Sequence, residues 1–203
     1  MKRLFIQSLI AVAALAAFGA ASAQERTIKF GVAGPETHPA AAGMKKFAEA
    51  VAAKSGGKMK VNLFYNSSLG TDQAVVSAIK GGTVEMAVMN SGILASEAKE
   101  LAIFDFPFLF ANEKESDAIV DGPLGKKLHA RLEEKGIIGL SYWELGYRQM
   151  TNSKRPLNKV EDIDGLKLRV IPNPINVDWV KALGANPTPM PFAEVYGGLE
   201  QKA

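Results

Sequence analysis

The sequence lacks cysteine altogether and has only two histidines among its 203 residues. Without cysteine the chain has no disulfide framework, no thiolate metal site, no cysteine nucleophile and no lipid-anchored cysteine. His38 and His129 are far apart in the sequence, which argues against a histidine metal cluster but leaves a carboxylate-rich site open. We therefore expect no metal site and no cofactor.

The motifs of common catalytic and phosphate-binding loops are also missing. The segment "GLSYW" has Trp143 where a G-x-S-x-G nucleophile turn needs its last glycine, and "MNSGI" lacks the first glycine. No G-x-x-x-x-G-K-[ST] phosphate loop occurs. We predict that the protein is not an enzyme. A periplasmic hydrolase that uses carboxylates such as Glu144 or Glu194 is the enzymatic alternative.

The N-terminus has the pattern of a secretory signal peptide. Lys2 and Arg3 form a basic head, residues 4–18 are largely apolar, and Ala21-Ser22-Ala23 is a small-residue cleavage site. The apolar run is too short for a retained span of about 20 residues. We expect residues 1–23 to be removed and the mature protein to lie in the periplasm.

The excess of positive charge is small once this leader is set aside. The whole chain has 24 Lys and Arg against 21 Asp and Glu, and the only charged residues of the leader are Lys2 and Arg3, so the remainder has a net charge of +1. Nucleic-acid binding needs a concentrated positive field, whereas the run "GKKLHARLEEK" mixes both signs as a solvated helix face does. We predict no nucleic-acid partner.

Apolar residues switch repeatedly between strand-like and helix-like spacing along the chain. Strands separated by helices predict βαβ units and a mainly parallel sheet, hence an α/β fold. The apolar run 101–110 is expected to pack as core under a loop. Strands are expected at residues 27–33, 58–65, 83–90, 137–144 and 166–171, and helices at residues 38–57, 71–82, 113–120, 125–135, 174–183 and from about 192.

A shift to polar composition near Leu145 predicts a boundary between two lobes, at residues 24–145 and 146–203. The last helix reaches Ala203 without a glycine, proline or cap to end it. We therefore expect the second lobe to be incomplete in this chain, and the chain alone to bind its ligand poorly.

Arg169 lies inside the short apolar run "GLKLRVIPNP". With a period of two, Leu168 and Val170 point to one side of a strand, and Arg169 points to the other. The local pattern leaves two interpretations open. Arg169 is either a solvated edge residue, or it lies at the carboxyl end of a parallel strand, where α/β sheets place their ligand crevices.

Three longer motifs occur in order: "GYRQMTNSKRP", "GLKLRVIPNP" and "LGANPTPMPFAEVYGGLE". With the weaker "KFGVAGPETHPA", "YNSSLGTD" and "FDFPFLF" they make residues 24–203 resemble the solute-binding proteins of tripartite ATP-independent periplasmic (TRAP) transporters, the DctP family. The resemblance implies a two-lobed periplasmic binding protein fold of type II-like form, closing over an organic acid. It also implies delivery to small and large integral-membrane subunits, and we expect a monomer. A binding protein for an ATP-driven importer is a further alternative.

The resemblance also implies which residues contact the ligand. An arginine in the "LRV" motif forks onto the ligand carboxylate, and a second arginine, an aromatic ring and several polar side chains surround it. The matching positions are Arg169, Arg148, Phe192, Asn90, Asn173 and His38. Two arginines suit either two carboxylates or one carboxylate beside hydroxyl groups, and the asparagines favour hydroxyls. We predict a uronate or other sugar acid, with a four-carbon dicarboxylate such as succinate or malate as the alternative.

Overall fold

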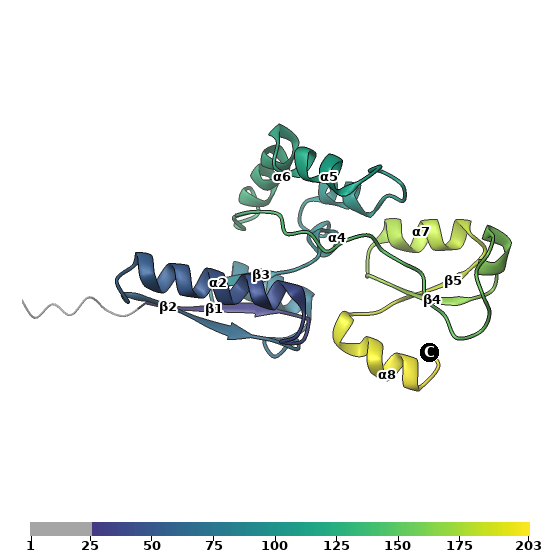
Figure 1. The fold of residues 1–203 in the computed structure, drawn as a ribbon, viewed down its shortest axis with the longest axis horizontal. Coiled ribbons are helices and arrows are strands. Elements are labelled where there is room, and N and C mark those ends of the chain that lie inside the picture. Colours follow the sequence, from purple (N-terminus) through teal and green to yellow (C-terminus); the bar gives the residue numbers. More distant parts are fainter. Residues whose placement is uncertain (1–25) are drawn as a thin grey trace, which may run out of the picture.

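The computed structural model describes residues 26–203. The predicted signal peptide, residues 1–23, lies outside the described residues. Within residues 26–203, no helix has both the length and the apolar composition needed to cross a membrane. In Figure 1 the first sheet with its helix α2, the helices α5 and α6, and the second sheet with α7 and α8 form three neighbouring groups around the short helix α4.

The first sheet is built from the N-terminal strands and is parallel throughout. Strands β1 (Arg26–Val32), β2 (Met59–Phe64) and β3 (Met86–Val88) pair in the order β2-β1-β3. Helices α2 (Pro39–Lys54) and α3 (Asp72–Lys80) connect them. The predicted βαβ pattern of this region is confirmed, although β3 is shorter than residues 83–90 because only three of its residues pair with β1.

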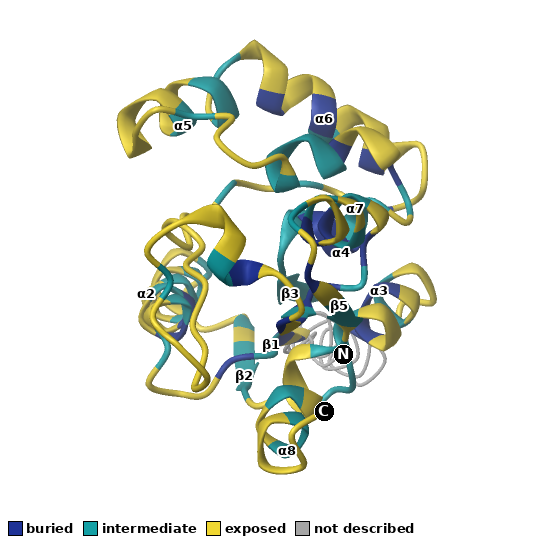
Figure 2. Ribbon diagram, turned by 90° about the vertical axis from the view of Figure 1, so that its right-hand side faces the viewer, coloured by how far each residue is buried: buried dark blue, intermediate teal, exposed yellow. Residues whose placement is uncertain are grey.

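Short helices follow the first sheet. They are α4 (Ser91–Leu94), the 3-10 helix η1 (Lys99–Asp105), α5 (Glu113–Val120) and α6 (Pro123–Glu133). The apolar face of α6 is buried, whereas α5 buries no residue (Figure 2). The first hydrophobic core joins α4, η1 and α6 to α3 and contains Val76, Ile93, Ala98, Leu101, Leu128, Leu132, Ile137 and Ile171.

The second sheet is a parallel pair, β4 (Lys167–Val170) and β5 (Asn186–Pro189), with α7 (Pro174–Ala182) as the crossover. A second core of Ile163, Leu166, Leu168, Val170, Val180 and Ala185 lies beneath it. The 3-10 helices η2 (Val160–Ile163) and η3 (Phe192–Glu194) and the helix α8 (Val195–Glu200) complete the region. Strand β5 was not predicted, because its sequence "NPTP" has proline at every second position and proline is tolerated only in edge strands.

The strand expected at residues 137–144 is wrong. A strand needs a partner for its backbone groups, and within the described residues no backbone–backbone hydrogen bond joins residues 138–158. Side chains hold this segment in place. Tyr142 stacks on His129 with ring centroids 4.3 Å apart, and Trp143 packs edge-on against Phe30 at 6.3 Å and covers Gly43. Aromatic side chains therefore attach this part of the chain to α6 through Tyr142 and to β1 and α2 through Trp143.

Replacing Tyr142 by phenylalanine tests this anchoring. The Tyr142 hydroxyl donates a hydrogen bond of 3.1 Å to the carbonyl of Gly125, and burial raises the pKa of Tyr142 to about 12. We expect Tyr142→Phe to lower the free energy of unfolding by about 1 kcal/mol, because stacking survives and one hydrogen bond is lost. Urea unfolding followed by circular dichroism measures the change; an unaltered midpoint would show that the hydroxyl contributes nothing.

The apolar run 101–110 divides into two halves, which corrects the expectation that all of it packs as core. Leu101 is 1% exposed, and Ile103 and Phe104 pack against the first core. Beyond Asp105 the chain turns outward, so that Phe106 and Phe108 are exposed. Proline at 107 ends the 3-10 helix, because the residue before a proline is disfavoured in helical conformations.

Candidate functional site

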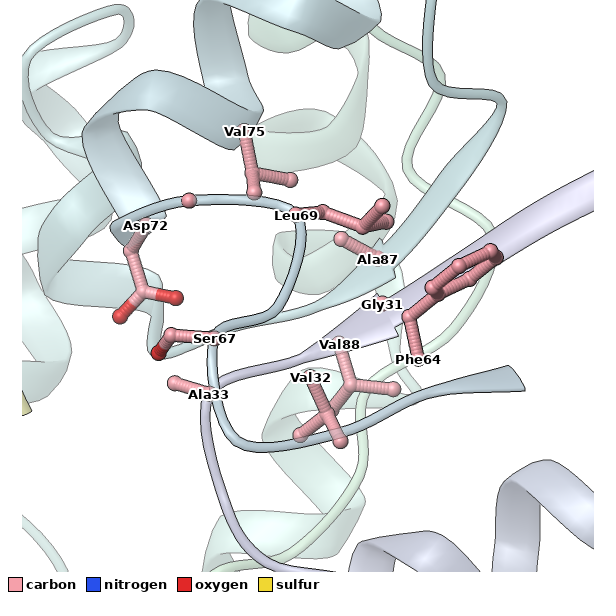
Figure 3. A pocket seen from close by; sticks show the side chains of 11 residues that line it. Gly31, Val32, Ala33, Phe64, Ser67, Leu69, Asp72, Val75, Ala87 and Val88 are labelled. Atoms are coloured by element: carbon pink, nitrogen blue, oxygen red, sulfur yellow. The ribbon is translucent and has the colours of Figure 1, made fainter. Parts of the chain in front are cut away.

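The carboxyl edge of the first sheet contains a small pocket (Figure 3). Its volume is about 10 Å³, room for about one water molecule. Ligands of open parallel sheets bind at this edge, outside the carboxyl ends of the strands. The pocket is lined by Gly31, Val32, Ala33, Phe64, Ser67, Leu69, Gly70, Asp72, Val75, Ala87 and Val88.

Asp72 is the ionisable residue of this pocket. It occupies the first position of α3, directly after Thr71, whose side chain caps the helix. Burial raises the pKa of Asp72, and the positive charge of Arg169 opposes that rise. Asp72 belongs to the first sheet region and Arg169 to the second, so the charge of Arg169 acts on a residue of the other sheet region without an ion pair between them.

Arg169 lies near the carboxyl end of the parallel strand β4. This is the position at which α/β sheets place their ligand crevices. It is half-buried, and its Nε donates a hydrogen bond of 2.9 Å to the carbonyl of Met190, just beyond β5. Burial lowers the pKa of Arg169, the positive charge of Arg148 lowers it further, and Asp72 opposes both. Arg169 is therefore partly buried and hydrogen-bonded rather than fully solvated, and its contact with a ligand stays a prediction.

The positive charge of Arg148 acts on Arg169, and neither arginine has a close carboxylate partner in the described part of the chain. Arg148 is exposed and lies in the segment that has no backbone pairing. Within residues 26–203, neither guanidinium forms an ion pair with a carboxylate. Like charges repel each other, and a bound anion would offset the repulsion between the two guanidinium groups. This arrangement suits a carboxylate ligand.

His38 and Asn90 follow β1 and β3, so both lie at the same carboxyl edge as Asp72. Each caps a helix: Nδ1 of His38 accepts from the backbone N–H of Ala40 at 3.2 Å, and Oδ1 of Asn90 accepts from Gly92 at 2.9 Å. Capping uses one polar atom of each side chain. Nε2 of His38 and Nδ2 of Asn90 remain chemically able to donate to a ligand, and both contacts stay predictions.

Asn173 and Phe192 differ in their surroundings. Asn173 is 3% exposed and caps α7, and its amide is engaged by Gly92, Asp105 and Ile175. Phe192 begins η3, two residues after the carbonyl that binds Arg169, and is 47% exposed. Arg169 thus experiences the charge of Arg148, and Phe192 follows Met190, which binds Arg169, by two residues, whereas Asn173 is occupied by protein contacts.

Asp72 lines the pocket at the first sheet but was not among the residues expected from the sequence. In "LGTD", Thr71 caps α3 and Asp72 is an acid in its first turn, a position that helix ends favour. The available signal was position: Asp72 follows β2 as His38 follows β1.

As for the carboxylate-rich metal site left open by the sequence, no three His, Asp or Glu side chains of residues 26–203 gather closely enough to hold a metal ion.

Comparison with known proteins places this fold among solute-binding proteins. The sugar acid binding protein DctPAm of Advenella mimigardefordensis, solved with galactonate, matches with a TM-score of 0.86 and 44% identity, over 88% of this chain and 58% of that one. A TRAP periplasmic solute-binding protein of Sulfurospirillum deleyianum with bound succinate matches with a TM-score of 0.84 and 33% identity, over 87% and 57%.

The family follows from the sequence match. A sequence model described as bacterial extracellular solute-binding protein, family 7 (DctP), matches residues 30–203, and the chain belongs to this family. The 2,3-diketo-L-gulonate-binding periplasmic protein YiaO of Escherichia coli K12 is 38% identical over 202 residues. The match covers all of this chain and 62% of YiaO, so the chain spans less than two thirds of the length of these relatives. The predicted family and α/β binding-protein fold are confirmed.

Proposed function

We propose that this protein is the periplasmic solute-binding component of a TRAP transporter and that it captures a sugar acid. The observation that carries the proposal is the partly buried Arg169 near the carboxyl end of β4, oriented by the Met190 carbonyl and without an ion-pair partner in residues 26–203. It binds its ligand reversibly, without catalysis, and delivers it to the small and large integral-membrane subunits. The family supports this role, since its members are solute-binding proteins.

The carboxylate of the ligand binds to the arginines. The Nε of Arg169 is held by Met190, which fixes the plane of the guanidinium and leaves its two terminal nitrogens for the ligand. Two parallel hydrogen bonds to a carboxylate give both strength and orientation. The partial burial of Arg169 strengthens this contact, because fewer water molecules compete for the charges.

The rest of the ligand carries hydroxyl groups. Asp72 is an acceptor when ionised, and hydroxyls are donors, so the two match. A second carboxylate placed near Asp72 would instead be repelled. His38 and Asn90 lie at the same edge, and Phe192 offers an apolar face to a sugar ring or carbon chain. YiaO and DctPAm are both similar to this chain and named for sugar acids, which supports the choice.

A four-carbon dicarboxylate is the second candidate. Two arginines are present, and one similar protein was solved with succinate at 33% identity. In that case Arg148 and Arg169 would each bind one carboxylate. Asp72 weighs against this candidate, because its negative charge lies close enough to Arg169 to compete with the second carboxylate.

A thermal-shift panel tests the proposed function. The complete gene product is heated with hexuronates, aldonates, succinate and malate, each at the same concentration. A ligand that binds only the folded state raises the unfolding temperature. We expect a shift with one or more sugar acids. A shift with the diacids alone would reject the sugar-acid proposal, and consumption of the ligand with turnover would reject the binding-protein role.

Asp72→Asn should change ligand preference. The substitution keeps the size of the side chain and removes its charge, so a hydrogen bond from a ligand hydroxyl is no longer charge-assisted. We expect affinity for the sugar acid to fall about 10-fold or more, while affinity for succinate does not fall. Titration calorimetry measures both, with Asp178→Asn on the exposed face of α7 as the control. An equal loss for both ligand classes would contradict a role in selectivity.

A further inference from the structure

Two buried asparagines at the start of α7 share one carboxylate. Asn173 and Asn176 are 3% and 2% exposed. Nδ2 of Asn176 donates to Oδ1 of Asp105 at 3.0 Å, and Nδ2 of Asn173 donates to Oδ2 of Asp105 at 3.2 Å. Each carboxylate oxygen therefore has its own amide donor. We call these three side chains the Asp105 junction; it connects the end of η1 to the start of α7.

The other polar atoms of the Asp105 junction are also bonded. Oδ1 of Asn173 accepts from the backbone N–H of Ile175 at 2.9 Å, and Oδ1 of Asn176 accepts from Nε1 of Trp179 at 3.1 Å. Each amide thus has a donor at its oxygen and an acceptor at its nitrogen, which fixes its orientation. A buried polar network with every member bonded is rigid, and it specifies one arrangement of the elements it joins.

The fit around Asp105 also depends on a glycine. Nδ2 of Asn173 donates to the carbonyl of Gly92 at 3.0 Å, and a Cβ atom at position 92 would overlap the Asp105 carboxylate. Gly92 begins the buried part of α4 in the first core region. The close approach of α4, η1 and α7 therefore needs a residue without a side chain at this place.

The junction lies between the first core and the strand that carries the ligand-binding arginine. Leu101 of η1 is buried in the first core four residues before Asp105, and Asn173 follows Arg169 by four residues. Burial raises the pKa of Asp105, and the Asn176 hydrogen bond and the positive charge of Arg148 oppose the rise. The charge of Arg148 therefore acts on Asp105, which is not among the residues that line the pocket at the first sheet.

We propose that Asp105 is a positioning residue of the binding site: through Asn173 and Asn176 it holds the start of α7, and with it Arg169, at a fixed place relative to the first sheet and Asp72. Its effect on ligand affinity rests on the proposed function, whereas the fixed placement is a property of the fold alone. The same geometry explains why Asn173, expected from the sequence to contact the ligand, is buried among protein groups.

An exchange of side chains tests the proposal. In Asp105→Asn, the new amide nitrogen faces one of the two asparagine donors, so one hydrogen bond is lost. In Asn176→Asp, two carboxylates face each other, so a hydrogen bond is replaced by repulsion. The double variant Asp105→Asn/Asn176→Asp restores every bond, because the new amide at 105 donates to position 176 and accepts from Asn173, while the new carboxylate still accepts from Trp179. Asp178→Asn, exposed on the same helix, is the matched control.

The main measurement is the distribution of distances between the two sheet regions. A general loss of stability would not broaden this distribution in the folded state. The chain has no cysteine, so spin labels attach selectively to Lys54→Cys on α2 and Lys181→Cys on α7, both exposed. We expect a narrow distance distribution in the parent and control proteins, a broad one in each single variant, and a narrow one in the exchange variant. Affinity for the sugar acid that shifts the parent protein should fall at least about 10-fold in each single variant and return in the exchange variant.

A narrow, parent-like distribution in Asp105→Asn would overturn the proposal, as would an exchange variant that is broader than either single variant. If a single variant fails to fold, the exchange variant decides: folding with the parent distance supports the junction, and failure to fold contradicts it. If the parent binds no sugar acid, the proposed function fails, while the distance measurements still decide the role of Asp105.

Discussion

Arg169→Ala should reduce affinity for the carboxylate ligand about 30-fold to several thousand-fold. Truncating one partner of a partly buried, hydrogen-bonded charge pair costs about 2–5 kcal/mol, because the carboxylate keeps its desolvation cost and loses its counter-charge. Arg169 is half-buried, and its guanidinium is oriented by the Met190 carbonyl. Titration calorimetry of parent and variant measures the loss directly.

Arg169→Lys separates charge from geometry. Lysine keeps the positive charge but has no planar fork, so it cannot form two parallel hydrogen bonds to a carboxylate. We expect affinity to fall markedly, although less than in the alanine variant. Arg155→Ala serves as the control for removal of an arginine elsewhere, since Arg155 donates to the carbonyls of Asp162 and Asp164. If Arg169→Ala bound the ligand as tightly as the parent protein, Arg169 would not contact the ligand.

Leu101→Ala should be among the most destabilising single substitutions in the chain. Leu101 is 1% exposed and packs in the first core, which joins α3, α4, η1 and α6 to Ile171 beyond β4. Removing a buried leucine side chain leaves a cavity and costs about 2–5 kcal/mol in the free energy of unfolding. Urea unfolding of the 203-residue chain, followed by circular dichroism, gives the change in midpoint.

The control for this substitution is Leu199→Ala in α8, where the leucine is 72% exposed. Exposed substitutions change stability by about 0.5 kcal/mol or less. The two variants remove the same atoms, so the difference between them reports burial alone. Equal effects of Leu101→Ala and Leu199→Ala would contradict the placement of Leu101 in the core.

The sequence predicted the regular elements whose local signals agree with their packing. The helix expected at 113–120 is α5, and the Thr71 cap and the Gly81-Gly82 stop delimit α3. These elements follow from spacing and capping chemistry, which are local. The strand expected at 137–144 failed for the opposite reason: strand formation depends on a partner, and apolar composition alone does not provide one.

The candidate site follows from the sequence only in part, again for physical reasons. Arg169 was singled out through a resemblance that rests on three motifs together, its place near the end of a parallel strand follows from the βαβ pattern, and its ligand contact stays a prediction. Asp72 and Asp105 were not among the expected residues. Their surroundings come from residues far away in the sequence, Arg169 for Asp72 and Asn176 for Asp105, and single-sequence spacing does not report such contacts.

Native mass spectrometry of the protein purified from cells identifies the ligand that it carries. The complete gene product is produced with its own N-terminus and purified without added ligand, and its bound small molecule is weighed and identified after release. We expect one molecule per chain of a polyhydroxy monocarboxylic acid, displaced by excess of the sugar acid that gives the largest thermal shift and lost in Arg169→Ala. A bound four-carbon diacid, or a ligand without a carboxylate that is retained in Arg169→Ala, would contradict this expectation.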